Sequence, residues 1–320
     1  RGICLMPPIT SARQHMDTQP MDIQSSATVL PLGGFPIVRT TSATLVPVLI
    51  KKMQQSPQQP ISLFFANTNF IVKCQAQKAA MLGSDTVIVN DGIGLDIASY
   101  LVHRKTFIEN LNGTDFTPLL LKEMSHQMND KPRVFLLGAK PGIAQRAAQT
   151  LINQHQVNVV GVRDGYEQAK DSAALIRAIN HSQATVVLVA MGNPYQEQWI
   201  INYRNQLNAS LLMGVGALLD FLAGDKTRAP AWVQGLRMEW FYRLCLEPTR
   251  LLRRYTLDIG RFLLLCLRSG KRLANSASGY VNEDYVEGDY VADSLEKKSQ
   301  RETAPQTKPE SFIARNDSSH

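Results

Sequence analysis

The chain has 320 residues, of which 44% are hydrophobic, an ordinary share for a globular protein. Its formal net charge of +7 favours anionic partners. The longest apolar run, residues 211–219, ends at Asp220 and is too short to span a membrane, and the four cysteines form no CxxC pair that would indicate a metal site or a disulfide framework.

The first 27 residues are polar and lack periodicity, which predicts a disordered leader. No signal peptide is expected, because prolines stand where its apolar core would lie. A hairpin is expected around Leu32–Ile37.

From about Val29 to Leu222, short apolar runs alternate with helix-like runs. The apolar runs predict strands at residues 62–65, 86–89, 134–137, 157–162, 185–190 and 210–215. Helices are expected between them, at residues 72–82, 116–128, 143–154, 171–181 and 196–206. This alternation predicts an α/β fold over residues 28–225, a Rossmann-like, mostly parallel sheet with helices on both faces.

A basic appendage is expected over residues 226–272, a segment that contains eleven Lys and Arg residues and three acidic residues. Its arginines recur at helical spacing beside Trp232, Trp240 and Phe241, a pattern typical of a surface that meets phosphates or anionic lipid heads. Residues 273–320 are polar and charged and should form a disordered tail.

Asp91 follows the strand expected at residues 86–89 and precedes a glycine turn, in the sequence NDGIG. In open α/β sheets, ligands bind beyond the carboxyl ends of the strands, so a carboxylate here could be a general base or a ligand-binding group. The alternative is a helix N-cap, a position that Asp also fills well.

Four further features follow expected strands. The loop at residues 138–142 is either a phosphate-binding turn before a helix or a plain connection. Tyr166 could stack on a base or pack against the protein. Gln196 and Glu197 open a helix, where an acid complements the helix dipole. Asp220 interrupts an apolar stretch and therefore needs a polar partner, either a ligand hydroxyl or a protein group.

Four blocks of the chain are VIVNDGIGLDIA, VFLLGAKPGIA, MGNPYQEQWI and GVGALLDFLAG, the last followed by RAPAWVQ and EWFYRLCLEPTRLLRRY. In order and spacing this series resembles the signature blocks of the WecG/TagA/CpsF family over roughly residues 30–260. The resemblance implies an inverting glycosyltransferase that moves a sugar from a UDP-sugar onto an undecaprenyl-diphosphate-linked acceptor. It also implies a Rossmann-like domain with a C-terminal helical appendage that meets the membrane.

The resemblance implies roles for individual residues. Asp91 matches the proposed base, which takes the proton from the acceptor hydroxyl. Asn67 matches the asparagine of the family's first polar motif and is expected to bind substrate, and Gln196 matches a glutamine that lines the sugar pocket. Tyr166 and Asp220 match positions on the nucleotide side.

Arg243, Arg250 and Arg253 match appendage arginines that can face the diphosphates. Guanidinium groups form bidentate hydrogen bonds with phosphate oxygens and neutralise their charge. For this reason no metal ion or other cofactor is expected. The expected location is the cytoplasm, with peripheral attachment to the inner face of the cell membrane through its anionic surface. A homo-oligomer is left open, and no nucleic-acid partner is expected.

Three positions depart from the family's pattern: Phe65, Asn110 and Asp164. They lie in the expected pocket and bear on which sugar is used. Two other classes of protein remain as alternatives. A dinucleotide oxidoreductase is disfavoured because no early GxGxxG is present. A membrane- or nucleic-acid-binding protein without enzymatic activity would use the basic appendage alone, and UDP binding would separate the transferase from both.

Overall fold

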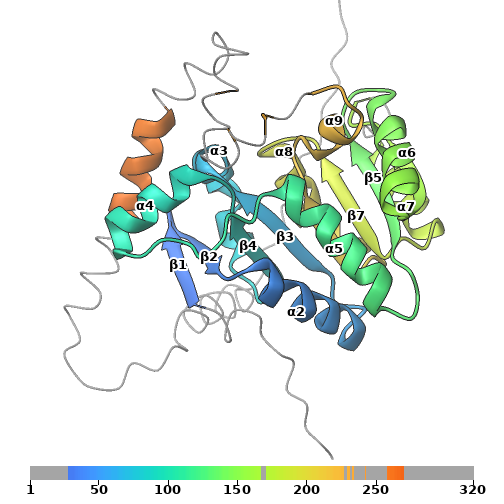
Figure 1. Cartoon of the computed structure of the whole chain (residues 1–320), viewed down its shortest axis with the longest axis horizontal. Coiled ribbons are helices and arrows are strands. Elements are labelled where there is room, and N and C mark those ends of the chain that lie inside the picture. Colours follow the sequence, from blue (N-terminus) through green and yellow to red (C-terminus); the bar gives the residue numbers. More distant parts are fainter. Residues whose placement is uncertain are drawn as a thin grey trace, which may run out of the picture. The chain divides into compact units, whose positions relative to one another are not determined.

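The computed structural model describes residues 28–166, 171–226, 229–230, 233, 242 and 258–269. Within them, one eight-stranded sheet has the order β1-β2-β4-β3-β8-β7-β5-β6. The strands are β1 Thr28–Leu32, β2 Phe35–Arg39, β3 Ile61–Ala66, β4 Thr86–Asn90, β5 Arg133–Gly138, β6 Asn158–Arg163, β7 Val186–Ala190 and β8 Leu211–Gly214. The sheet runs through the centre of the described core, with helices on either side (Figure 1).

The described helices are α2 Ser42–Gln55, α3 Thr68–Lys73, α4 Ile93–His103, α5 Gly113–Gln127, α6 Ile143–His155, α7 Ser172–His181, α8 Tyr195–Tyr203 and α9 Leu218–Leu222. Two 3-10 helices, Cys74–Met81 and Arg204–Gln206, extend α3 and α8. Residues 258–269 are also helical. No helix in the described part of the chain is long and apolar enough to cross a membrane.

Every pairing in the sheet is parallel except that of β1 with β2. These two strands form the expected hairpin, which turns at Gly33 and Gly34 with φ of +60° and +85°. Glycine suits such a turn because positive φ carries no side-chain penalty there. The α/β fold class is confirmed.

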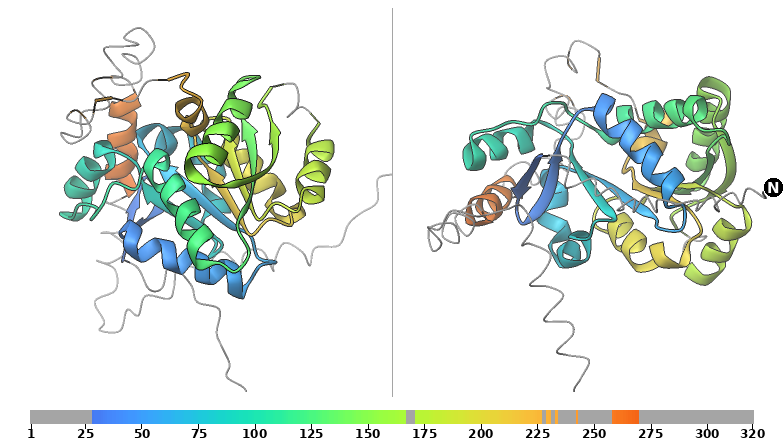
Figure 2. Two further views of the ribbon diagram at one scale, coloured as in Figure 1. Left: turned by 45° about the vertical axis from the view of Figure 1, so that its right-hand side comes forward. Right: turned by 90° about the horizontal axis from the view of Figure 1, so that it is seen from below.

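Two apolar layers cover the faces of the sheet. Along β3, Leu63 and Phe65 belong to one layer and Phe64 and Ala66 to the other, as the two-residue period of a strand requires. Helices α2, α5, α6 and α9 contribute to the first layer, and α3, α4, α7, α8 and the helix 258–269 contribute to the second. Figure 2 shows this sandwich of helices about the sheet in two further views.

The neighbouring strands β3 and β8 lead to helices on opposite faces. After β3 the chain enters α3, whose Phe70 and Ile71 lie in the second layer. After β8 it enters α9, whose Leu218 and Leu219 lie in the first. In open α/β sheets, such a divergence of neighbouring connections marks the usual ligand site. The fold therefore directs attention to the carboxyl edge of β4, β3, β8 and β7.

All six strands expected after the hairpin are present, with ends displaced by at most one residue. Four of the five expected helices are present. Most of the range expected as an α-helix at residues 72–82 is instead the 3-10 helix Cys74–Met81, which follows α3, a short α-helix that begins at Thr68. Helices α2, α4 and α9 were not expected. The leader, the tail and most of the appendage, including Trp232, Trp240 and Phe241, lie outside the described residues.

Candidate active site

Asn67 and Asp91 lie side by side at the carboxyl edge of the sheet. The last residues of β3 and β4, Ala66 and Asn90, are register partners, so the residues that follow them are neighbours. Nδ2 of Asn67 donates a hydrogen bond to Oδ2 of Asp91 at 3.2 Å. Oδ1 of Asn67 accepts from the first-turn amides of α3, those of Asn69 and Phe70, both at 3.1 Å. The helix cap thus fixes the amide that holds the carboxylate.

The loop around Asp91 is fixed by its backbone. The Asp91 N–H donates to the Ala66 carbonyl at 2.7 Å, and the Gly92 N–H donates to Oδ1 of Asn110 at 2.6 Å. Gly92, not Asp91, takes the N-cap position of α4, so the helix-cap alternative for Asp91 is wrong. A half-buried carboxylate held by an amide donor at the edge of the sheet is suited to accept a proton from a bound hydroxyl.

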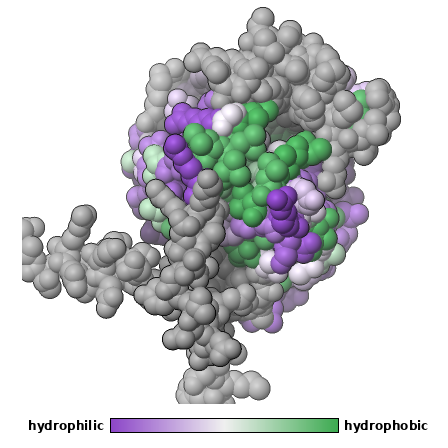
Figure 3. Space-filling view, turned by 90° about the vertical axis from the view of Figure 1, so that its left-hand side faces the viewer, coloured by the Kyte–Doolittle hydropathy of each residue, from purple (hydrophilic) through white to green (hydrophobic). Residues whose placement is uncertain are grey.

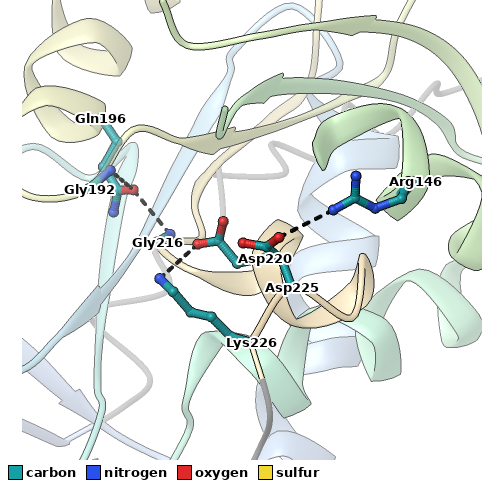
Figure 4. A network of polar contacts seen from close by, with 7 residues as sticks. All are labelled: Arg146, Gly192, Gln196, Gly216, Asp220, Asp225 and Lys226. Carbon is teal, nitrogen blue, oxygen red and sulfur yellow. Dashed lines mark hydrogen bonds and ion pairs between the residues drawn. The ribbon is translucent and has the colours of Figure 1, made fainter. Parts of the chain in front are cut away.

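Gln196 joins the loops that follow β7 and β8. Its Oε1 accepts hydrogen bonds from the N–H groups of Gly192 at 3.2 Å and Gly216 at 3.0 Å. Its Nε2 donates to Oε1 of Glu197 at 2.7 Å. Figure 4 shows the amide between the two glycines. The Gln196 side chain is 2% exposed, so it supports the loops from within, and a contact with a sugar stays a prediction.

Three glycines of this edge border open space. They are Gly92 after β4, Gly192 after β7 and Gly216 after β8, with φ of +99°, +75° and +57°. A Cβ built on any of them would meet no atom within 4 Å. Gly138, after β5, is different, because a Cβ there would run into the backbone of Ala190. Open space beside bare backbone permits the close approach of a ligand.

Glu197 is buried beneath these loops, with 1% of its surface exposed. Burial raises the pKa of its carboxyl group to about 7, and the hydrogen bond from Gln196 acts in the opposite direction. Cys74 lies against the carboxyl group, and burial together with Glu197 raises the pKa of its thiol. The sequence analysis interpreted Glu197 as a partner of the helix dipole and did not predict that it is buried. The one sequence feature that indicates burial is the position of Glu197 just before the core residues Trp199 and Ile200.

Asp220 has the polar partner that its place in an apolar stretch required. Its Oδ2 pairs with Nζ of Lys226 at 3.0 Å, and its side chain is 20% exposed. Arg146 of α6 pairs with Asp225 at 3.3 Å nearby, as Figure 4 shows. A protein group therefore satisfies Asp220, and a contact with the nucleotide stays a prediction.

Tyr166 lies at the far end of the sheet, beyond β6. This strand is three positions from β8, which corresponds to about 14 Å at the usual spacing of strands. The ring is 56% exposed, and the Tyr166 N–H donates to Oδ1 of Asp164 at 2.9 Å. The structure does not bring Tyr166 together with Asp91. The loop at residues 138–142 adjoins it, since the Gly165 N–H donates to the Ala139 carbonyl.

The remaining expected site residues divide into two groups. Arg243, Arg250 and Arg253 lie outside the described residues. Two of the positions that depart from the family's pattern, Phe65 and Asn110, lie near the carboxyl edge of the sheet. Phe65 is buried and packs edge-on against Phe116, whereas Asn110 accepts the hydrogen bond that holds Gly92. Among the described residues, no cluster of three potential metal ligands occurs.

Comparison with known proteins shows which family the chain resembles. The model of the glycosyl transferase WecG/TagA/CpsF family matches residues 30–276. A relative from Bacillus subtilis (strain 168), N-acetylglucosaminyldiphosphoundecaprenol N-acetyl-beta-D-mannosaminyltransferase, is 33% identical over 193 residues, which are 60% of this chain and 72% of the relative.

Proposed function

Because the chain belongs to the WecG/TagA/CpsF family of glycosyl transferases, we propose that it transfers a hexose or N-acetylhexosamine from a UDP-sugar. The acceptor is a saccharide linked to undecaprenyl diphosphate, and the product enters a bacterial surface polysaccharide or exopolysaccharide. The name of the Bacillus relative, which specifies a diphosphoundecaprenol acceptor and an amino-sugar transfer, supports this substrate class.

In the proposed reaction, Asp91 accepts the proton of the acceptor hydroxyl. The hydroxyl oxygen attacks the anomeric carbon from the side opposite the nucleotide. A carbon–oxygen bond to the acceptor forms, the bond to the diphosphate breaks, and UDP leaves with its electron pair. Direct displacement inverts the anomeric configuration. The amide of Asn67, which donates to Oδ2, leaves the carboxylate oriented for this proton transfer.

The open space beside Gly92, Gly192 and Gly216 is the proposed position of the transferred sugar. Gln196 shapes this space through the two loops that it joins. Charge on the leaving diphosphate is neutralised by Arg243, Arg250 and Arg253, so the reaction proceeds without a metal ion. Because the acceptor is anchored in a bilayer, the proposed location is the inner face of the cell membrane, with peripheral attachment.

One observation carries the proposal: a carboxylate held by a capping amide lies next to Gly92, beside which a Cβ would meet open space, at the edge of the sheet where the connections after β3 and β8 turn to opposite faces. The test is a panel of UDP-sugars with a short-chain diphospholipid acceptor, measured by release of UDP. Asp91→Asn should bind UDP with unchanged affinity and transfer roughly 10²- to 10⁴-fold more slowly, the range for loss of a general base.

Asp130→Asn is the matched control, because Asp130 is exposed at the opposite edge of the sheet, ahead of β5. It should leave turnover unchanged. Near wild-type turnover by Asp91→Asn at saturating substrates would show that another group accepts the proton. Failure of the wild-type chain to release UDP with any donor would overturn the proposed activity itself.

A further inference from the structure

Two peptide groups orient the side chain of Asp91, one on either side of its Cα. The peptide before it is held through the Asp91 N–H, which donates to the Ala66 carbonyl at 2.7 Å. The peptide after it is held through the Gly92 N–H, which donates to Oδ1 of Asn110 at 2.6 Å. Because each peptide group is planar, the two hydrogen bonds together orient the Cα–Cβ bond of Asp91.

The two hydrogen bonds have different origins. The bond from Asp91 to Ala66 is made between backbone groups and continues the pairing of β3 with β4, so it depends on no side chain. The bond from Gly92 depends on the side chain at position 110. Position 110 is one of those that depart from the family's pattern, so this contact follows from the sequence of this chain in particular.

Packing does little to restrain Gly92. Its φ is +99°, and a Cβ built on it would meet no atom within 4 Å. It is the N-cap of α4, and no side chain caps this helix end. Helix α4, on the side of the molecule that faces the viewer in Figure 3, leaves Ile97 and Tyr100 each 52% exposed. Since glycine has the largest conformational freedom of any residue, the hydrogen bond from Asn110 is what restrains this peptide.

Asn110 lies on a well-anchored segment, residues 104–112, which connects α4 with α5 (Figure 1). Phe107 is 5% exposed and belongs to the second apolar layer, whereas Leu111 is 1% exposed and belongs to the first. Between them, Oε2 of Glu109 accepts hydrogen bonds from the N–H and the hydroxyl of the first residue of α2, at 2.8 and 3.0 Å. The backbone beneath Asn110 is therefore fixed, and its amide can hold the glycine loop in place.

We propose that Asn110 is a positioning residue for the transfer reaction: its amide orients the peptide between Asp91 and Gly92, and through it the carboxylate that accepts the proton. The inference rests on the proposed function, in which Asp91 is the base. Because Asn110 acts through Asp91, its loss should lower kcat and leave KM unchanged. Misplacement of a reacting group by about 1 Å costs on the order of 10²-fold in rate, so kcat should fall roughly 10- to 100-fold.

Asn112 provides a matched control in the same segment. Its Oδ1 accepts hydrogen bonds from the N–H groups of Thr114 and Asp115, at 3.1 and 3.0 Å, and thereby caps α5. The experiment compares Asn110→Ala with Asn112→Ala by UDP release, with a UDP-sugar and a short-chain diphospholipid acceptor. Both variants should have a lower melting temperature than wild type. Only Asn110→Ala should have a lower kcat.

A double variant tests whether Asn110 acts through Asp91. Once Asp91→Asn has removed the base, its orientation no longer matters, so adding Asn110→Ala should slow the residual transfer by less than about twofold. A further loss as large as in the wild-type background would overturn the proposal, because Asn110 would then act independently of Asp91. A raised KM for the UDP-sugar with unchanged kcat would overturn it too, because Asn110 would then be a substrate contact.

Hydrogen exchange of the Gly92 amide reports on the contact without an activity assay. In protein labelled with ¹⁵N-glycine, this amide should exchange at least about tenfold faster in Asn110→Ala and at the wild-type rate in Asn112→Ala. Unchanged exchange in Asn110→Ala would overturn the proposal. A second variant, Asn110→Leu, keeps a branched side chain without the acceptor and should show the same loss of kcat, which guards against loosening of the segment by alanine.

The outcomes separate this inference from the proposed function. If Asp91→Asn is impaired but Asn110→Ala keeps the kcat of Asn112→Ala, the positioning role is wrong and the proposed function stands. If Asp91→Asn turns over like wild type, Asp91 is not the base, and the positioning role fails with it.

Discussion

Replacing Glu197 by Gln tests the buried pair beneath the glycine loops. The substitution preserves the shape of the side chain and an oxygen that can accept the hydrogen bond from Gln196. It removes the negative charge from a group that is 1% exposed. Since the charged form is what burial disfavours, the effect should appear only where Glu197 is ionised.

The expected magnitude follows from the pKa. Burial raises it from the ordinary value of 4.5 to about 7, and a shift of one unit corresponds to ~1.4 kcal/mol. Between these pH values the folded protein retains a proton that the unfolded chain has lost, so stability falls as pH rises. The wild-type free energy of unfolding should therefore lose roughly 3 kcal/mol from below pH 4.5 to above pH 7 through this group.

The assay is urea unfolding of wild type and Glu197→Gln from pH 5 to pH 8.5. The free energy of unfolding of the variant, relative to wild type, should rise with pH and level off above about pH 7. Glu123→Gln, at a partly exposed carboxyl on α5, is the control and should run parallel to wild type. A pH-independent difference between Glu197→Gln and wild type would refute the reasoning, whatever its size, because a constant offset reports only the hydrogen bonds of the new amide.

Three further predictions concern the site. Asn67→Asp keeps an oxygen for the α3 cap but replaces the donor to Asp91 with a second carboxylate, so it should slow UDP release about 10-fold or more and lower the melting temperature above about pH 5, where both groups are charged. Asn67→Ala should slow UDP release as well and cost about 1 kcal/mol of stability through the lost cap. Gly216→Ala puts a methyl group into the opening at φ +57° and should raise KM for the donor in the same assay; an unchanged KM would place the donor elsewhere. Turnover should survive EDTA, and a loss that Mg²⁺ restores would reveal a metal site.

The strands were predictable because buried parallel strands are continuous apolar runs. The sequence VVLVA in β7, flanked by polar residues and glycine, is such a run. The helices were harder. Helix α2 contains Pro47, a residue that usually indicates the end of a helix, so the sequence did not predict this helix. Helix α4 begins within the glycine-rich sequence NDGIG, which indicates a turn. The cap that starts α3 is Asn67, whose motif had been attributed to substrate binding alone.

The candidate site was predictable residue by residue but not as an arrangement. Position after a strand singled out Asp91 and Gln196, because loops at the carboxyl edge carry ligands in this class of fold. The contact between Asn67 and Asp91 depends on the register of β3 with β4, which the sequence does not encode locally. Burial of Glu197 likewise depends on the packing of α8 against the 3-10 helix Cys74–Met81, which is distant in sequence.

The two amide–carboxylate pairs of the site follow one design. In each, the amide oxygen accepts two backbone N–H groups and the amide nitrogen donates to a carboxylate: Asn67 to Asp91, and Gln196 to Glu197. A carboxylate at the nitrogen fixes which way the amide faces, since a flipped amide would turn its N–H₂ toward backbone donors and leave them unsatisfied, at a cost of about 1–3 kcal/mol each.

The pairs differ in exposure, and that difference assigns their roles. Glu197 is sealed under the loops and can act only by orienting Gln196, and through it Gly192 and Gly216. Asp91 is half-buried and adjoins the opening beside Gly92, where a hydroxyl can reach it. Of the two carboxylates, only Asp91 is therefore placed to accept a proton from a substrate, and loss of turnover in Glu197→Gln should be far smaller than in Asp91→Asn.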